Sequence, residues 1–222
     1  ETDSGCPAFP LCYMVLQAIL IEELFMPNRY VPGTNPRKEK DRYTYKDYKT
    51  WGEEEKWELI KGIPYAISPS PQRTHQTLVV QLISQLDTFF RGKPCRPLTA
   101  PVDVFFPEGE EDLDSIQTIV QPDILVVCDP SKLIEEGVRG APDFIIEILS
   151  PATALKDQSE KKNLYEKKGV REYWIVNPNT LETFVYLLRD GSYGLPTVHS
   201  LRELVDVTIF PGLALRAREE EL

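Results

Sequence analysis

The run of apolar residues at Phe144–Leu149 predicts a β-strand that carries a charged residue inside it. This run, FIIEIL, lies between Pro142 and Ser150-Pro151, and only Glu147 interrupts it. Strand alternation places on one face Asp143, Ile145, Glu147 and Leu149. Because an unpaired carboxylate in a sheet core costs several kcal/mol, Glu147 is expected to be paired, protonated or bound to a cation.

The segment before this strand predicts a short helix, a hairpin and a long core helix, beginning near Arg42. Two short strands flank a turn at Gly62. The long helix is predicted to start at Thr74 as its N-cap and to end at Gly92. Its apolar face is formed at helical spacing by Leu78, Val79, Leu82, Leu86 and Phe89.

The remaining apolar runs predict further strands and complete an α/β pattern. The connector Asp129–Gly140 is expected to hold a helical turn. The predicted strands are Cys95–Phe106, Val120–Cys128 and Glu172–Asn177, then a hairpin over Thr183–Val198 turning at Asp190-Gly191, and a last pair around Val205–Ala214. The pattern favours one sheet-based domain.

Composition narrows the class of protein only modestly. The chain has 222 residues, of which 41% are hydrophobic, as expected for one globular domain with appendages. Its 25 Lys+Arg and 35 Asp+Glu give a formal net charge of −10. This balance argues against a protein that coats nucleic acid non-specifically, because such proteins present a basic surface to phosphates. It does not exclude an enzyme whose cleft is made locally positive by a metal.

The cysteines disfavour a zinc site. The chain has four cysteines without C-x-x-C spacing and two histidines, so a zinc ligand cluster is not indicated. Cys128 ends an apolar run and is interpreted as a buried free thiol. Together with the lack of an export signal, this predicts a cytoplasmic location in a reducing compartment.

The segment 1–41 is interpreted as an extension and linker that is poorly ordered, separate from a domain over 42–222. Leu11–Met26 is strongly apolar, but it contains Glu22-Glu23, lacks a basic flank and is shorter than the roughly 20 residues a membrane span needs. An amphipathic helix or disordered extension is the simpler interpretation, with membrane attachment as the alternative. We expect no membrane partner for the domain.

A second carboxylate stands at the start of another predicted strand. Asp123, in QPDILVV, follows a proline and opens an aliphatic run. By itself it could cap a turn. Paired with Glu147 on a neighbouring strand, it forms a site suited to Mg²⁺, which commonly uses one or two carboxylates together with water and phosphate oxygens.

A lysine is predicted to join these carboxylates from a helix over 158–168. Helical spacing places Lys161, Leu164, Tyr165 and Lys168 on one face, whereas Lys162 lies on the next face. Lys161 is therefore selected over Lys156 and Lys162 as the lysine that points to the sheet. It could orient a water molecule or stabilise charge on an attacked phosphate. The alternative is that the EKK run is a solvated helix face.

Two further residues are candidates whose local sequence leaves the role open. Glu58 stands between Trp57 and Leu59 at the start of a strand, where a surface position is the simpler interpretation and a site carboxylate the alternative. His75 lies in the first turn of the core helix, on the edge of its apolar face. It is either satisfied by a neighbouring backbone group or takes a catalytic or phosphate-contacting role.

From about Tyr43 onward the sequence resembles the Uma-type ("Uma two") restriction endonucleases of bacteria, in the PD-(D/E)XK nuclease superfamily. The resemblance rests on WELIKG, the HQ at His75-Gln76, PVDV at Asp103, QPDILVV, PDFIIEILSPAT, the D-x-x-E-K ending at Lys161, and GVREYWIVNP. The E-x-K pattern of the superfamily would place its lysine at position 149, which is Leu149 here. The resemblance implies that the lysine has moved to the helix, where Lys161 matches. Asn177 stands where many members have aspartate.

The resemblance implies an α/β restriction endonuclease-like core, with a mixed β-sheet flanked by helices and additional N-terminal and C-terminal β-hairpins. It implies an endonuclease that hydrolyses phosphodiester bonds in DNA with Mg²⁺, for which Mn²⁺ can substitute. Asp123 and Glu147 would bind the metal and Lys161 would assist the attacking water. Glu58 would complete the site and His75 would lie at its edge. Asp103 is less favoured as a participant, because strand alternation gives no independent reason to aim it at Glu147.

Three classes of function remain open from the sequence. The first is the metal-dependent DNA endonuclease, for which a homodimer is expected because duplex cleavage needs two cuts. The second is a non-catalytic nucleic-acid-binding or assembly module that retains the nuclease fold. The third is a hydrolase of a small phosphorylated or nucleotide substrate. Clustered carboxylates favour the enzyme, because carboxylates repel phosphate unless a cation lies between them.

Overall fold

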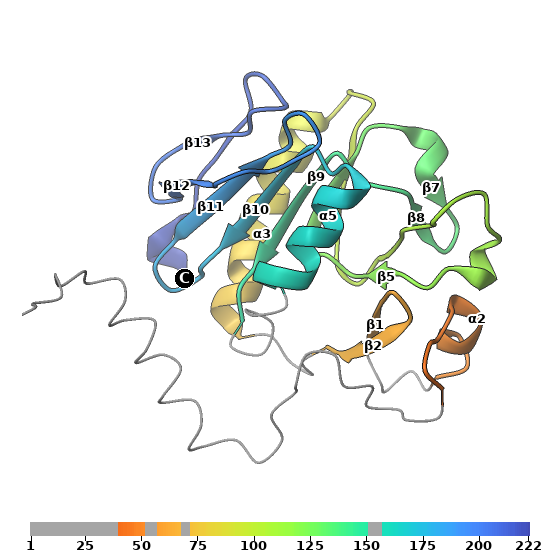
Figure 1. The fold of residues 1–222 in the computed structure, drawn as a ribbon. Helices are drawn as coiled ribbons and strands as arrows, with labels where there is room; N and C mark the ends of the chain where they lie inside the picture. Colours follow the sequence, from red (N-terminus) through yellow and green to blue (C-terminus); the bar gives the residue numbers. More distant parts are fainter. Residues whose placement is uncertain (1–39, 52–56, 68–71, 151–156) are drawn as a thin grey trace, which may run out of the picture. The chain divides into compact units, whose positions relative to one another are not determined.

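The computed structural model describes residues 40–51, 57–67, 72–150 and 157–222 (Figure 1). Its central element is a six-stranded mixed sheet in the order β12-β11-β10-β9-β6-β3. β9 and β10 are parallel, and the other neighbouring pairs are antiparallel. The strands are β3 (Arg96–Thr99), β6 (Ile124–Val127), β9 (Phe144–Ile148), β10 (Glu172–Val176), β11 (Glu182–Leu187) and β12 (Thr197–Ser200).

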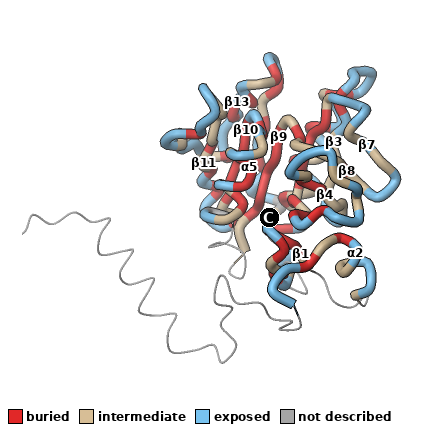
Figure 2. Tube along the Cα trace, turned by 45° about the vertical axis from the view of Figure 1, so that its right-hand side comes forward, coloured by how far each residue is buried: buried red, intermediate tan, exposed pale blue. Residues whose placement is uncertain are grey.

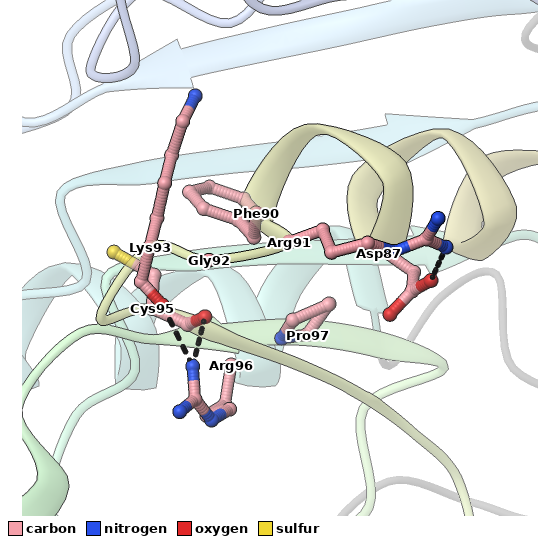
Figure 3. A pocket seen from close by; sticks show the side chains of 8 residues that line it. All are labelled: Asp87, Phe90, Arg91, Gly92, Lys93, Cys95, Arg96 and Pro97. Atoms are coloured by element: carbon pink, nitrogen blue, oxygen red, sulfur yellow. Dashed lines mark hydrogen bonds and ion pairs between the residues drawn. The ribbon is translucent and has the colours of Figure 1, made fainter.

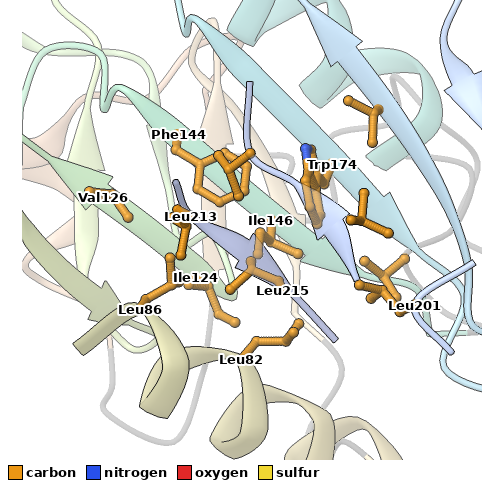
Figure 4. Close-up of a cluster of buried hydrophobic side chains, with 14 of the residues drawn as sticks. Leu82, Leu86, Ile124, Val126, Phe144, Ile146, Trp174, Leu201, Leu213 and Leu215 are labelled. Atoms are coloured by element: carbon orange, nitrogen blue, oxygen red, sulfur yellow. The ribbon is translucent and has the colours of Figure 1, made fainter. Parts of the chain in front are cut away.

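One helix covers each face of this sheet near β9. The long helix α3 (Arg73–Phe90) lies on one face and α5 (Lys162–Lys168) on the other (Figure 1). The buried residues on the α3 side include Leu82, Leu86, Ile124, Val126, Phe144, Ile146 and Trp174 (Figure 4). Ile145 instead packs with Leu164 of α5, so the predicted alternation along β9 is confirmed. Both faces are buried, and the central strands are buried along their length (Figure 2).

A second six-stranded sheet, ordered β2-β1-β5-β4-β8-β7, contributes side chains to the core on the α5 side. Its strands are β1 (Trp57–Ile60), β2 (Ile63–Ala66), β4 (Asp103–Phe105), β5 (Ile119–Val120), β7 (Leu133–Ile134) and β8 (Gly137–Arg139). The short helix α2 (Tyr45–Tyr48) joins it through an aromatic cluster in which the Tyr45 and Phe105 rings lie 4.8 Å apart. Because β1 is a strand of this second sheet, the sheet holds it near the central strands.

Short elements complete the described chain. A π-helical turn, η3 (Asp157–Lys161), leads directly into α5. The remaining elements are η1 (Leu113–Ser115), η2 (Pro130–Lys132), η4 (Glu219–Glu221) and the pair β13 (Val205–Asp206) and β14 (Ala214–Leu215). The predicted last strand pair is thus confirmed as β13 and β14.

Two predicted strands are each divided between the two sheets. The segment Cys95–Phe106 forms β3 in the central sheet and β4 in the second, and Val120–Cys128 similarly provides β5 and β6. Pro101 lies in the first break and Pro122 in the second, and a proline cannot donate a hydrogen bond to a strand ladder. The connector Asp129–Gly140 holds the expected helical turn, η2, and also the hairpin of β7 and β8, which the sequence did not indicate.

Two local predictions are wrong. Helix α3 begins at Arg73 with Gln72 as its N-cap, two residues before the predicted cap Thr74, and it ends at Phe90. Cys128 is not a free thiol, because it forms a disulfide with Cys95. The antiparallel register of β3 and β6 brings these two cysteines opposite one another although 33 residues separate them. The interpretation of Cys128 as a free thiol therefore no longer supports the expectation of a reducing cytoplasm.

The apolar segment Leu11–Met26 lies outside the described residues, so neither interpretation of it is decided by the structure. Within the described ranges, no helix is both long enough and apolar enough to cross a membrane.

Candidate active site

Lys161 reaches two buried carboxylates that come from different sheets. Its Nζ lies 2.8 Å from Oε1 of Glu147 on β9 and 2.9 Å from Oε1 of Glu58 on β1. The three side chains are between 2% and 4% exposed. The predicted contact between Lys161 and Glu147 is confirmed, although Lys161 is the last residue of η3, directly before α5, and not part of one helix over 158–168. The surface interpretation of Glu58 is wrong. The sequence alone could not show that β1 packs beside the central sheet.

The placement of Lys161 follows from chain connectivity. Strands β9 and β10 are parallel, so the chain must cross over between their ends, and α5 is the helix of this crossover. Its Tyr165 and Leu164 pack on the β9 face that includes Ile145, which is also the face of Glu147. Gly169 ends α5 with φ of 85°, a conformation that glycine adopts at little cost.

Tyr165 is a site residue that the sequence analysis did not assign. Its hydroxyl donates a hydrogen bond of 2.8 Å to Oε1 of Glu147, the oxygen that also contacts Lys161. The side chain is fully buried, and its ring lies 5.0 Å from that of Tyr173 in an edge-to-face contact. The signal was present, because Tyr165 lies four residues after Lys161 on the same predicted helix face.

Asp123 and His75 form a second pair beside Glu147. Asp123 Oδ2 lies 3.2 Å from Nε2 of His75 and accepts a 2.7 Å hydrogen bond from the backbone N–H of Ile148. Ile124 pairs with Ile146, so extending this register by one residue places Asp123 opposite Glu147. The Asp123 side chain is 21% exposed and His75 is largely buried. His75 thus contacts a carboxylate, where its local sequence suggested a neighbouring backbone group.

A polar network on the second sheet extends from Glu58. The backbone N–H of Gln121 donates to Glu58 Oε1 at 2.7 Å, and its side-chain Nε2 donates to Asp103 Oδ1 at 2.8 Å. Burial raises the pKa of the Asp103 carboxyl, and the nearby Glu58 raises it further. Burial likewise raises the pKa of Tyr48, whose hydroxyl lies 3.5 Å from the same Asp103 oxygen. Asp103, which the sequence did not favour as a participant, is therefore connected to the site through Gln121.

The carboxylates supply oxygen donors of the type that Mg²⁺ uses. Asp123 and Glu147 come from adjacent strands, and Mg²⁺ commonly needs only one or two carboxylates besides water and phosphate oxygens. Among the described residues, no group of three or more His, Cys, Asp or Glu side chains is arranged to hold a metal ion. Two carboxylates from adjacent strands would leave most of the coordination sphere of a bound Mg²⁺ to water and phosphate oxygens.

Comparison with known proteins identifies the family. The sequence profile of the Uma2 family, described as "Putative restriction endonuclease", matches residues 44–218. The chain belongs to the Uma2 family. The matched region includes all of the site residues described above, from Tyr48 to Tyr165.

Two individual proteins are also similar to this chain. The "Uncharacterized protein slr1290" of Synechocystis sp. (strain ATCC 27184 / PCC 6803 / Kazusa) is 24% identical over 147 residues, which cover 65% of this chain and 73% of that protein. The crystal structure of "a putative nuclease belonging to DUF820" from Anabaena variabilis ATCC 29413 matches with a TM-score of 0.61 and 23% identity, covering 78% of this chain and 94% of that one. Membership of Uma2 and this structural match confirm the predicted family and the nuclease-like α/β fold.

A hollow elsewhere on the Uma2 chain is separate from these residues. It lies at the C-terminal end of α3 and the start of β3, whereas His75 lies at the N-terminal end of α3 (Figure 3). Arg91 pairs with Asp87 at 3.0 Å, and Arg96 Nη1 donates to the carbonyl of Lys93 at 2.8 Å. The charged groups that line the hollow are thus engaged with the protein itself.

Proposed function

We propose that this Uma2 chain is a Mg²⁺-dependent endonuclease that hydrolyses phosphodiester bonds in DNA. The observation that carries the proposal is the position of Lys161, buried between Glu147 and Glu58 and next to the strand end that bears Asp123. A binding module has no physical need for a buried ammonium group together with two strand-borne carboxylates. The membership of a nuclease family supports the same reaction class.

In this proposal each residue has a definite task. Asp123 and Glu147 hold Mg²⁺, or Mn²⁺ in its place, which when bound would withdraw charge from the phosphate and lower the pKa of water. Lys161 donates hydrogen bonds that orient the attacking water and stabilise the charge that develops on the phosphate. The water oxygen forms the new P–O bond and gives up a proton to solvent, the ester P–O bond breaks, and the leaving oxygen takes a proton from solvent.

The partners of these residues keep them in position. Glu58 and Tyr165 fix the Lys161–Glu147 pair from two sides, through contacts of 2.9 Å and 2.8 Å. His75 holds the Asp123 carboxylate, which is also fixed by the backbone of Ile148. The Asp123 carboxylate is more exposed than those of Glu58 and Glu147, so we propose that the DNA phosphate approaches from the Asp123 side.

The test is nicking of supercoiled plasmid in Mg²⁺ or Mn²⁺ by wild type, Glu147→Gln and Lys161→Met. Each substitution is expected to lower the nicking rate by about 100-fold or more, as for the loss of a group that stabilises transition-state charge. Glu172→Gln is the matched control, because Glu172 is also a buried carboxylate but bonds Trp174 on the α3 side of the sheet. It should nick at the wild-type rate below its melting temperature.

Two results would overturn the proposal. Equal nicking by all four proteins would mean that the Lys161 site is not the catalytic one. Absence of nicking by all four, with no Mn²⁺ binding by calorimetry, would favour the non-catalytic binding module. Cleavage of both strands requires two sites, so we propose a homodimer as the active form, which light scattering of the purified protein would test.

A further inference from the structure

Gln121 occupies the point where the chain crosses between the two sheets. Strand β5 ends at Val120 in the second sheet and β6 begins at Ile124 in the central sheet. Only Gln121, Pro122 and Asp123 lie between them. Pro122 has no N–H group, and Asp123 turns its carboxylate to His75 and Ile148. Gln121 is therefore the residue of this crossing that faces the Glu58 side of the site.

Gln121 donates to two carboxylates at once. Its backbone N–H bonds Glu58 Oε1 at 2.7 Å, and its side-chain Nε2 bonds Asp103 Oδ1 at 2.8 Å. The same Nε2 lies 3.4 Å from the Tyr48 hydroxyl. An ionised carboxylate only accepts hydrogen bonds, so the contact with Asp103 fixes which end of the Gln121 amide faces it. A neutral double donor thus lies between two like charges that otherwise repel.

The contacts continue without a break into the proposed active site. Glu58 Oε1, which accepts the Gln121 N–H, is the same oxygen that contacts Lys161 Nζ at 2.9 Å. Lys161 in turn contacts Glu147. A shift of Gln121 away from Glu58 would therefore be transmitted to the position of the Lys161 ammonium group. Neither Gln121 nor Asp103 touches the groups proposed to react.

We propose that Gln121 is a positioning residue, anchored to the second sheet by Asp103, that sets Glu58 against Lys161. This inference rests on the proposed function for its catalytic consequence. It predicts that the direction of the hydrogen bond between residues 121 and 103 is not important in itself. What matters is that one of the two side chains donates and the other accepts.

The test exchanges the two chemical groups. Gln121→Glu places a carboxylate against the Asp103 carboxylate, whereas Gln121→Glu combined with Asp103→Asn restores a donor and an acceptor with reversed polarity. The single substitution is expected to lower kcat for plasmid nicking by about 10- to 100-fold, with KM within about threefold, as for residues that orient catalytic groups. The combined variant should recover most of the wild-type kcat.

A second readout does not depend on activity. A backbone N–H bonded to a carboxylate has a proton resonance at low field, so the amide signal of residue 121 reports its bond to Glu58. This signal should move upfield in Gln121→Glu and in Glu58→Gln, and return toward its wild-type position in the combined variant. A melting temperature that recovers in the combined variant while kcat and the amide signal do not would show a purely structural role and overturn the proposal.

The remaining outcomes are also decisive. Wild-type kcat and an unmoved amide signal in Gln121→Glu would equally overturn the positioning role. If wild type neither nicks DNA nor binds Mn²⁺, the proposed function fails, and the amide signal alone then decides whether the Gln121–Asp103 pair holds Glu58. The two failures are therefore distinguishable.

Discussion

Removing the Lys161 ammonium group is the most informative perturbation of this protein. Lys161→Met keeps a side chain of similar length but leaves Glu58 and Glu147, which are 1% and 2% exposed, without the cation that lies 2.9 Å and 2.8 Å from them. Breaking a buried ion pair by removing one partner costs about 3–5 kcal/mol, because the remaining charge stays desolvated. Two carboxylates are affected here, so we expect the upper part of this range at pH 7.

The free energy of unfolding is measured by urea denaturation monitored by tryptophan fluorescence. Unchanged m-values would show that the variant and wild type expose the same amount of surface on unfolding. Lys162→Met is the matched control, because Lys162 is the next residue and its Nζ lies over the Tyr186 ring, 5.5 Å from the ring centroid. A contact of this kind contributes about 0.5–1 kcal/mol. The control should therefore lose no more than about 1 kcal/mol.

A double substitution identifies the cause of the loss. In Glu58→Gln/Lys161→Met one of the two carboxylates is neutral, so the pair repulsion is removed. We expect the double variant to lose less free energy of unfolding than the two single variants lose together. The difference should be about 0.5–3 kcal/mol, as found for residues in one polar network. A loss below about 1 kcal/mol in Lys161→Met, or strictly additive single effects, would refute the reasoning that these charges form one buried unit.

Two further predictions concern single contacts. Tyr165→Phe removes only the hydroxyl that bonds the strand carboxylate and should lower the free energy of unfolding by about 1.5–3 kcal/mol, the range for a hydrogen bond to a charged group; an unchanged urea midpoint would contradict it. Lys168, followed by Lys167, lowers the pKa of Glu108 below its ordinary value of 4.5, so Glu108 adds stability above that pH and loses it as the pH falls through its folded pKa. Because Glu108 is 60% exposed, Glu108→Gln should cost at most about 1 kcal/mol at pH 7, the cost should shrink as the pH falls through the folded pKa, and 1 M salt should reduce it.

Local periodicity was sufficient to predict the half of the site that lies on β9 and α5. Alternation fixed the face of Glu147, and helical spacing selected Lys161 over Lys162. Both inferences depend only on neighbours in the chain, and the short β9-α5-β10 connection leaves α5 few places to pack. The π-helical turn before α5 did not disturb the result, since Lys161 is its last residue.

The other half of the site depends on contacts between the two sheets, which no local pattern reveals. Glu58 was interpreted as a surface residue because the sequence alone does not show whether its strand borders the site, and its burial depends on the pairing of β1 with β5. The strand over Val120–Cys128 looked continuous, and its division at Pro122 is what gives Gln121 access to both sheets. The disulfide between Cys95 and Cys128 was hidden for the same reason, because the register of β3 and β6 is a tertiary property.

The position of the lysine explains how this chain departs from the E-x-K pattern that its family resemblance implies. Leu149 stands at the usual lysine position, on the Glu147 side of the sheet, and packs against the core that includes α5. The ammonium group instead arrives from the helix and meets Glu147 at 2.8 Å. The proposed reaction requires an ammonium group beside Glu147, whichever sequence position carries it. Because Lys161 lies in the turn that leads directly into α5, the next helical turn also supplies Tyr165 to the same carboxylate oxygen. The strand, the helical segment and the second sheet thus each fix one side of the ion pair.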